Sequence, residues 1–171
     1  MELRTSERLP AGASTVAAIL ADPDFHRAAV ARATDGATAD VSVAGSPPAA
    51  FSVAVRWTMT TPDLPEQLRE YLPSGLLVRQ VNAWDTEGAD GSRRGTVTLD
   101  IVGAPVHVRG TAMLQSHGPN SCELAYVTHL RSTIPFAAAT IERAAAPAVR
   151  DALRAERDEL FARLALPPAP D

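Results

Sequence analysis

The amino-acid sequence predicts an α+β fold in which a curved antiparallel sheet of about seven strands wraps around one long C-terminal helix. Two observations lead to this fold. Strand-like segments with a hydrophobic period of two fill the middle of the chain. The last third then changes to a helical period, in one long Ala-rich amphipathic run over residues 136–164. Since the sheet is the only large partner for the apolar stripe of that helix, the two are expected to pack together.

The first part of the chain predicts one strand and two short helices. Residues 2–9 alternate loosely between polar and apolar side chains, which is typical of a strand. Ser14 stands before the apolar run 15–20 and is the expected N-cap of the first helix. The second helix, residues 24–33, is expected to begin with Asp22 as its cap and the following proline at its first position.

Six further strands are expected after these helices, separated by turns rich in Gly, Pro, Asn and Asp. They are residues 40–44, 50–60, 76–86, 94–102, 106–116 and 122–132. The segment 62–72, flanked by prolines, predicts a helical turn over one end of the sheet. The tight turn after residue 102 predicts that Asp100 and Arg109 face each other across two strands as an ion pair.

The closing helix carries apolar side chains at spacings of three, four and seven, which predicts that one face is buried. Pro147 lies inside this run and is expected to kink the helix or divide it in two. The sequence shows no internal repeat, so we expect a single domain over residues 1–166, followed by a Pro-rich tail at 167–171.

Composition excludes several classes of function. The net charge of −4 over 171 residues argues against a nucleic-acid partner, which a basic surface would favour. No apolar run is long enough for an integral membrane protein, and the N-terminal segment does not resemble a signal peptide. The single cysteine, Cys122, is expected to be a buried thiol on a strand. These observations predict a cytoplasmic protein, as a monomer or a homodimer.

Several short stretches resemble a known superfamily. They are Leu72-Pro73 with the strand Val78-Arg79 to Trp84, Gly110-Thr111-Ala112, and Ile134-Pro135 leading to Ile141-Glu142. Together with the order strand, two helices, six strands, helix, they resemble the helix-grip proteins of the START-like superfamily (SRPBCC, the birch-pollen-allergen-like proteins). The resemblance is to an actinobacterial family of unknown function within it. It implies apolar ligand binding, lipid transfer or chemistry of the polyketide cyclase kind.

No pattern in the sequence predicts a metal site, a cofactor or a conventional catalytic motif. His26 follows two aspartates, but they are expected to cap its helix and leave the histidine exposed. His107 and His129 alternate with apolar residues on strands, so they are expected to point outward, and His117 is expected in a turn.

The expected site is therefore a cavity between the sheet and the closing helix, where many helix positions are alanine and fill space incompletely. Two of its expected residues, Tyr126 and Asn82, would supply polar groups that orient a ligand. The complete set of expected lining residues is Trp57, Met59, Asn82, Trp84, Leu99, Leu114, Tyr126, Leu130, Phe136 and Ile141.

These residues lead to three hypotheses. The first is a binding or carrier protein for a small hydrophobic molecule such as a lipid, an isoprenoid or a polyketide. The second is an enzyme resembling polyketide cyclases and dehydratases, with Glu142, or His129 or Arg131, as a cavity acid or base. For Glu142, the competing interpretation is that it pairs at the helix surface. The third hypothesis is an interaction protein whose core is filled.

Overall fold

The computed structural model describes residues 1–34, 36–60, 75–134 and 136–165. Within these ranges the strands form one antiparallel sheet in the order β1-β7-β6-β5-β4-β3-β2. The strands are β1 (Glu2–Leu9), β2 (Asp40–Gly45), β3 (Phe51–Met59), β4 (Leu76–Trp84), β5 (Arg93–Ile101), β6 (Val106–Ser116) and β7 (Cys122–Ser132). The helices are α1 (Ala13–Leu20), α2 (Pro23–Ala33) and α3 (Ala138–Arg163). The predicted α+β fold is confirmed.

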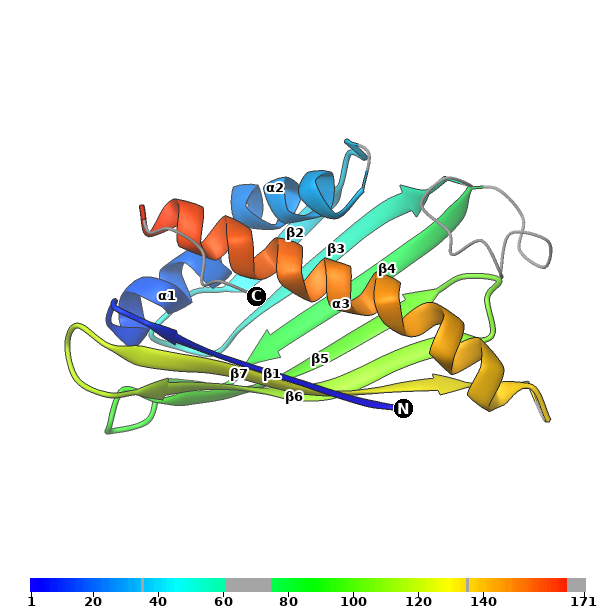
Figure 1. The fold of residues 1–171 in the computed structure, drawn as a ribbon. Coiled ribbons are helices and arrows are strands. Elements are labelled where there is room, and N and C mark those ends of the chain that lie inside the picture. Colours follow the sequence, from blue (N-terminus) through cyan, green and yellow to red (C-terminus); the bar gives the residue numbers. More distant parts are fainter. Residues whose placement is uncertain (35, 61–74, 135, 166–171) are drawn as a thin grey trace.

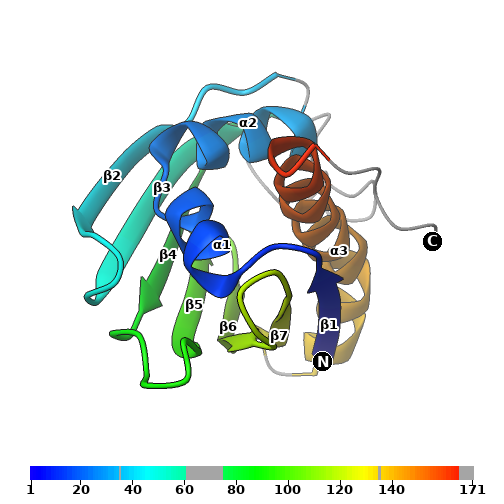
Figure 2. The same ribbon diagram turned by 90° about the vertical axis from the view of Figure 1, so that its left-hand side faces the viewer.

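The sheet and the long helix are packed as the sequence predicts. Helix α3 lies across one face of the sheet, and α2 lies beside the C-terminal half of α3 (Figure 1). Viewed from the end of the molecule, the sheet curves around the helices (Figure 2). Strands β1 and β2 form the two edges, and α1 and α2 carry the chain from one edge to the other. The concave face of the sheet therefore faces α3 and α2.

Alternating burial along the strands explains why the sheet has one apolar face. In β3, Phe51, Val53, Val55 and Trp57 are buried, whereas the residues between them are half-buried or exposed. Strands β1, β6 and β7 have the predicted bounds, and the other four differ from the prediction by one or two residues at an end. The sequence pattern therefore located every strand, although β2 is almost entirely exposed and shows no alternation of burial.

The two short helices begin differently. As predicted, Asp22 caps α2, because its Oδ1 accepts a hydrogen bond from the Asp24 N–H at 2.9 Å and proline follows at the first position. The prediction of Ser14 as the cap of α1 is wrong. This helix begins at Ala13 after Gly12, with no side-chain cap. A side chain at Gly12 would meet the carbonyl of Pro119, so this close approach favours glycine there.

The predicted ion pair between Asp100 and Arg109 is also wrong. The register across the β5–β6 turn differs from the expected one by two residues, so Asp100 pairs with His107 and Arg109 faces Thr98. The Nδ1 atom of His107 lies 2.7 Å from Oδ1 of Asp100. His107 nevertheless lies on the outward face, as the alternation predicted, and its side chain is partly exposed.

Helix α3 continues through Pro147 without interruption, so of the two predicted effects, a kink or a division into two helices, the division is wrong. A proline within a helix removes one backbone N–H and leaves the carbonyl four residues earlier without its partner. Here that carbonyl belongs to Arg143, and both residues are exposed. Because water can hydrate an exposed carbonyl, the helix can tolerate proline at this position.

The buried residues form two clusters. The larger one joins α1, α2 and the concave face of the sheet to the end of α3, through Leu160 and Phe161. The smaller one lies under the first half of α3 and comprises Val106, Val108, Leu130, Ala145 and Ala146. The expected exposure of His26 is wrong. It is buried in the first cluster's helical layer, and its Nε2 lies 2.9 Å from the carbonyl oxygen of Leu20.

Two predictions concern residues outside the described ranges. They are the helical turn at 62–72 and the Pro-rich tail at 167–171. Cys122 is buried as predicted, and burial raises the pKa of its thiol to about 11. In the described part of the chain, no helix is long and apolar enough to cross a membrane.

Candidate functional site

A cavity of about 430 Å³ lies between α3 and the concave face of the sheet. It borders both buried clusters, because residues of the larger cluster, such as Trp57 and Tyr126, and of the smaller one, such as Val108 and Ala145, line it. Its volume is within the range of about 300–1,000 Å³ that is common for small-molecule sites. The cavity is thus a gap between two well-packed regions.

The residue types on the two walls explain why the gap remains. Helix α3 presents Ala144, Ala145, Ala148 and Ala152 to the cavity, while the sheet presents larger aliphatic and aromatic side chains from β3 to β7. A methyl side chain reaches only a short way from the helix backbone, so it does not fill the space between the layers. The lining from the sheet and the loops is Trp57, Met59, Val78, Gln80, Val97, Leu99, Ile101, Ala104, Val106, Val108, Tyr126 and Thr128.

Polar groups in this lining join the sheet to the helix. The side-chain amide of Gln80 on β4 donates one hydrogen bond to Oε1 of Glu156 on α3 at 2.9 Å. It donates another to Oδ1 of Asn82 at 3.2 Å. Both Gln80 and Glu156 line the cavity, whereas Asn82 is buried and does not line it, so the expectation for Asn82 is wrong. A carboxylate therefore lies at the edge of an otherwise largely apolar space.

Tyr126 and Thr128 enter the cavity from β7. Burial raises the pKa of the Tyr126 hydroxyl well above its ordinary value, and the negative charge of Glu156 raises this pKa further. The hydroxyl therefore stays protonated at neutral pH and can donate a hydrogen bond. The indole N–H of Trp57 is also buried, and it has no hydrogen-bond partner among the described residues.

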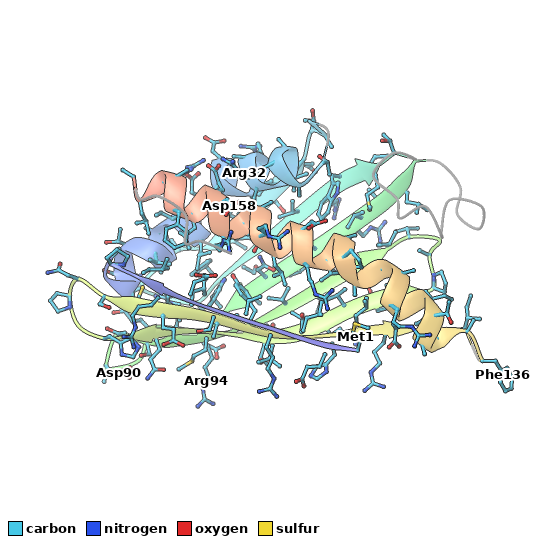
Figure 3. The ribbon with its side chains drawn as sticks, in the orientation of Figure 1. Met1, Arg32, Asp90, Arg94, Phe136 and Asp158 are labelled. Carbon is cyan, nitrogen blue, oxygen red and sulfur yellow. The ribbon has the colours of Figure 1, made fainter. Side chains whose placement is uncertain are left out.

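The structure brings some of the ten expected lining residues together and separates others. Trp57, Met59, Leu99 and Tyr126 line the cavity. Leu130 belongs to the smaller cluster beside the cavity and Ile141 packs against that cluster, so neither lines the cavity. The expectation that Phe136 faces the sheet is wrong, because this residue precedes the helix with a φ of 66° and its side chain is fully exposed. Figure 3 shows it at one end of the molecule, pointing away from the body.

Trp84 and Leu114 are buried in the larger cluster and do not line the cavity. Trp84 stacks on Phe51 with ring centroids 6.3 Å apart. Its ring also covers Gly95, where an added Cβ would lie 2.8 Å from the ring. Because of these contacts, the Trp84 side chain packs at one end of the sheet and not against the cavity. The alternation that places residues on the inward face does not say which of them border a gap.

Sequence reasoning missed Gln80 and Glu156 as site residues, although a signal for each was present. On β4, Gln80 lies two residues from Val78 and from Asn82 on the inward face. On α3, Glu156 lies three residues after Leu153 and four before Leu160, within the apolar stripe. A polar residue at an apolar position is the pattern that would have identified both.

The acids and bases proposed from the sequence lie elsewhere. Glu142 accepts hydrogen bonds from the backbone amine of Met1 at 2.8 Å and the Ser132 N–H at 3.2 Å, and these hydrogen bonds lower the pKa of its carboxyl. His129 is partly exposed and lies 3.8 Å from Glu2, and Arg131 is exposed. None of these residues lines the cavity. The interpretation of Glu142 as a pairing residue is confirmed.

No group of His, Cys, Asp and Glu residues in the described ranges has the arrangement needed to hold a metal ion. The partly exposed carboxylates of Asp100 and Glu123 instead lie near His107 and His117, at 2.7 Å and 3.6 Å. These contacts join neighbouring residues of the sheet and its turns.

Solved structures with the same fold include two enzymes and a START superfamily protein. The aromatase/cyclase Zhui from Streptomyces sp. R1128 is 12% identical, with 96% of this chain and 95% of that chain covered and a TM-score of 0.57. Norcoclaurine synthase from Thalictrum flavum, in complex with dopamine and hydroxybenzaldehyde, is 12% identical, with coverage of 96% and 86% and a TM-score of 0.55. A START superfamily protein from Mycobacterium smegmatis is 10% identical, with coverage of 95% and 98% and a TM-score of 0.53.

At these identities the likeness establishes the fold alone, which is the helix-grip fold of the START-like superfamily. The actinobacterial origin expected from the sequence stays a prediction. No curated protein matches the sequence significantly. Residues 4–163, however, match a family described as "Protein of unknown function (DUF2505)", and the chain belongs to that family.

Proposed function

We propose that this protein binds a small hydrophobic molecule, of the lipid, isoprenoid or polyketide kind, in the cavity between α3 and the sheet. The observation that carries the proposal is the cavity of about 430 Å³, whose walls are mainly alanine, valine, leucine and isoleucine side chains. Burial of apolar ligand surface contributes roughly 25 cal/mol per Å². A gap of this size and chemistry also argues against the alternative of a filled core.

The site offers less support for an enzyme. The acid–base residues considered from the sequence, Glu142 and His129, do not line the cavity. Glu156 does, but its Oε1 atom accepts a hydrogen bond from Gln80, and Tyr126, another polar residue of the wall, stays protonated. A carboxylate and a hydroxyl can orient a ligand without reacting with it. Binding is therefore the function that the geometry supports best.

A dye-binding experiment with a blocked cavity tests this proposal. Nile red, an uncharged dye that fluoresces in apolar surroundings, should become fluorescent with the wild-type protein. Ala148 lines the cavity, so Ala148→Phe should abolish the signal by filling it. Ala162 is on the same helix but exposed, so Ala162→Phe is the matched control and should bind normally.

Thermal unfolding of each variant shows whether it is folded. If Ala148→Phe does not fold, Ala152→Leu is tested in its place, because it adds less volume at another position that lines the cavity. Equal Nile red binding by wild type and a folded cavity-filled variant would overturn the proposal, as would no binding by the wild type.

A further inference from the structure

Glu156 differs from its neighbouring carboxylates on α3. Asp151, Asp158 and Glu159 each form an ion pair with an arginine, at 3.0 Å in every case. Glu156 forms no ion pair with a described residue, although the helix around it is rich in arginine. Its one protein partner in the described ranges is the neutral amide of Gln80. Asp151 and Glu156 both line the cavity, and of these two carboxylates Glu156 is the one whose charge no described arginine neutralises.

The hydrogen bonds of Gln80 leave part of this carboxylate free. The amide nitrogen of Gln80 donates to Glu156 Oε1 and to Asn82 Oδ1, and an amide NH₂ has two protons. Oε2 of Glu156 accepts no hydrogen bond from a described residue. A carboxylate in a largely apolar cavity favours a donor at each oxygen. A ligand that offers a donor would meet this requirement.

Two donors that have no hydrogen-bond partner in the described part of the chain line the same cavity. The hydroxyl of Tyr126 is protonated, and it lies near enough to Glu156 for the carboxylate charge to raise its pKa. The indole N–H of Trp57 is buried without a hydrogen-bond partner among the described residues. A ligand group that accepts a hydrogen bond as well as donating one would satisfy these groups together with Glu156. A hydroxyl does both.

We infer that the cavity selects uncharged apolar molecules that carry a hydroxyl group, and that Glu156 accepts the hydrogen bond from this hydroxyl. This inference rests on the proposed function, because it names the class of ligand for the same cavity. The fixed negative charge of Glu156 repels a carboxylate or a phosphate in the same position. Fatty acids and phosphorylated lipids are accordingly excluded in favour of alcohols and phenols.

Decanol and decanoate test the inference, because they share a chain length and differ in the charge of the end group at about pH 7. Each is titrated into the protein to displace bound Nile red. The dissociation constant of decanol should be at least about tenfold lower than that of decanoate. A difference of this size is expected when a repulsion between like charges replaces a hydrogen bond. Glu156→Gln should reduce that preference to about threefold or less, because the amide of glutamine carries no charge.

Asp158→Asn is the matched control. Asp158 is on the same helix (Figure 3), where it pairs with Arg157. It is not among the residues that line the cavity. Removal of its charge should leave the preference for decanol unchanged, whereas a general effect of net charge would change it in both variants. Thermal unfolding confirms that both variants are folded.

The outcomes separate this inference from the proposed function. If wild type binds Nile red but prefers decanoate or shows no preference, the inference is wrong and the proposed function stands. The inference is equally wrong if Glu156→Gln keeps the wild-type preference, or if Asp158→Asn loses it too. If Nile red and decanol both fail to bind, the proposed function fails, and the inference fails with it.

Discussion

The side chains of Gln80 and Glu156 form a hydrogen bond of 2.9 Å that joins the concave face of the sheet to the helix that covers it. The two residues are 76 positions apart in the sequence and meet at the edge of the cavity. This contact fixes a carboxylate beside a space that is otherwise largely apolar. It therefore links the packing of the fold to the chemistry of the candidate site.

Removal of this contact should weaken the fold. Gln80→Ala should lower the free energy of unfolding by about 1–2 kcal/mol, because it leaves Glu156 without its amide partner. Urea denaturation measures the change. Gln115→Ala, at an exposed position on β6, is the control and should have an effect of at most about 0.5 kcal/mol. Equal losses in the two variants would show that the hydrogen bond contributes nothing.

Replacement of Pro147 should stabilise the protein. Proline in a helix interior is about 3 kcal/mol less favourable than alanine. Because Pro147 is exposed in an uninterrupted helix, we expect Pro147→Ala to raise the free energy of unfolding by about 1–3 kcal/mol. Pro23→Ala is the comparison, since proline suits the first turn of α2 and its removal should not stabilise. Loss of stability in Pro147→Ala would mean that the proline fits this helix better than its geometry indicates.

Phe136 should be dispensable for stability. A left-handed φ of 66° is unfavourable for a bulky residue, and its exposed ring contributes no burial. Phe136→Gly should therefore leave the melting temperature unchanged or raise it. Phe25→Ala, which removes a fully buried ring, should cost about 3–5 kcal/mol. A large loss in Phe136→Gly would contradict the exposed position of this side chain.

The buried thiol should make stability depend on pH in the alkaline range. The pKa of Cys122 is raised to about 11 in the folded protein, above its ordinary value of 9.0. The thiol ionises more readily in the unfolded chain, so its contribution is fully present below about pH 9 and is lost as the pH rises to about 11. The free energy of unfolding should fall more steeply over this range in wild type than in Cys122→Ala. Parallel curves for the two proteins would contradict the shifted pKa.

The strands were predictable because their information is local. Alternation of polar and apolar side chains in β1, β6 and β7 defines both the period and the ends of each strand. The pairing across the β5–β6 turn was not predictable in the same way. Asp100 meets His107 because of where the turn closes, and a shift of two residues preserves the alternation while changing every partner.

The candidate site was predictable only in outline. Alanine at many positions of α3 indicated a gap, and the inward positions of Trp57 and Tyr126 followed from strand period. The contact between Gln80 and Glu156 depends on how the helix crosses the sheet, which no local pattern encodes. The burial of His26 depends in the same way on the packing of α2 in the folded molecule.

A crystal structure of the protein with decanol tests the central claim most directly. The account predicts electron density for the alkyl chain between Ala148 and the sheet, with the hydroxyl within hydrogen-bond distance of Glu156. Density for the alcohol only outside this cavity, in crystals grown at a saturating decanol concentration, would contradict it.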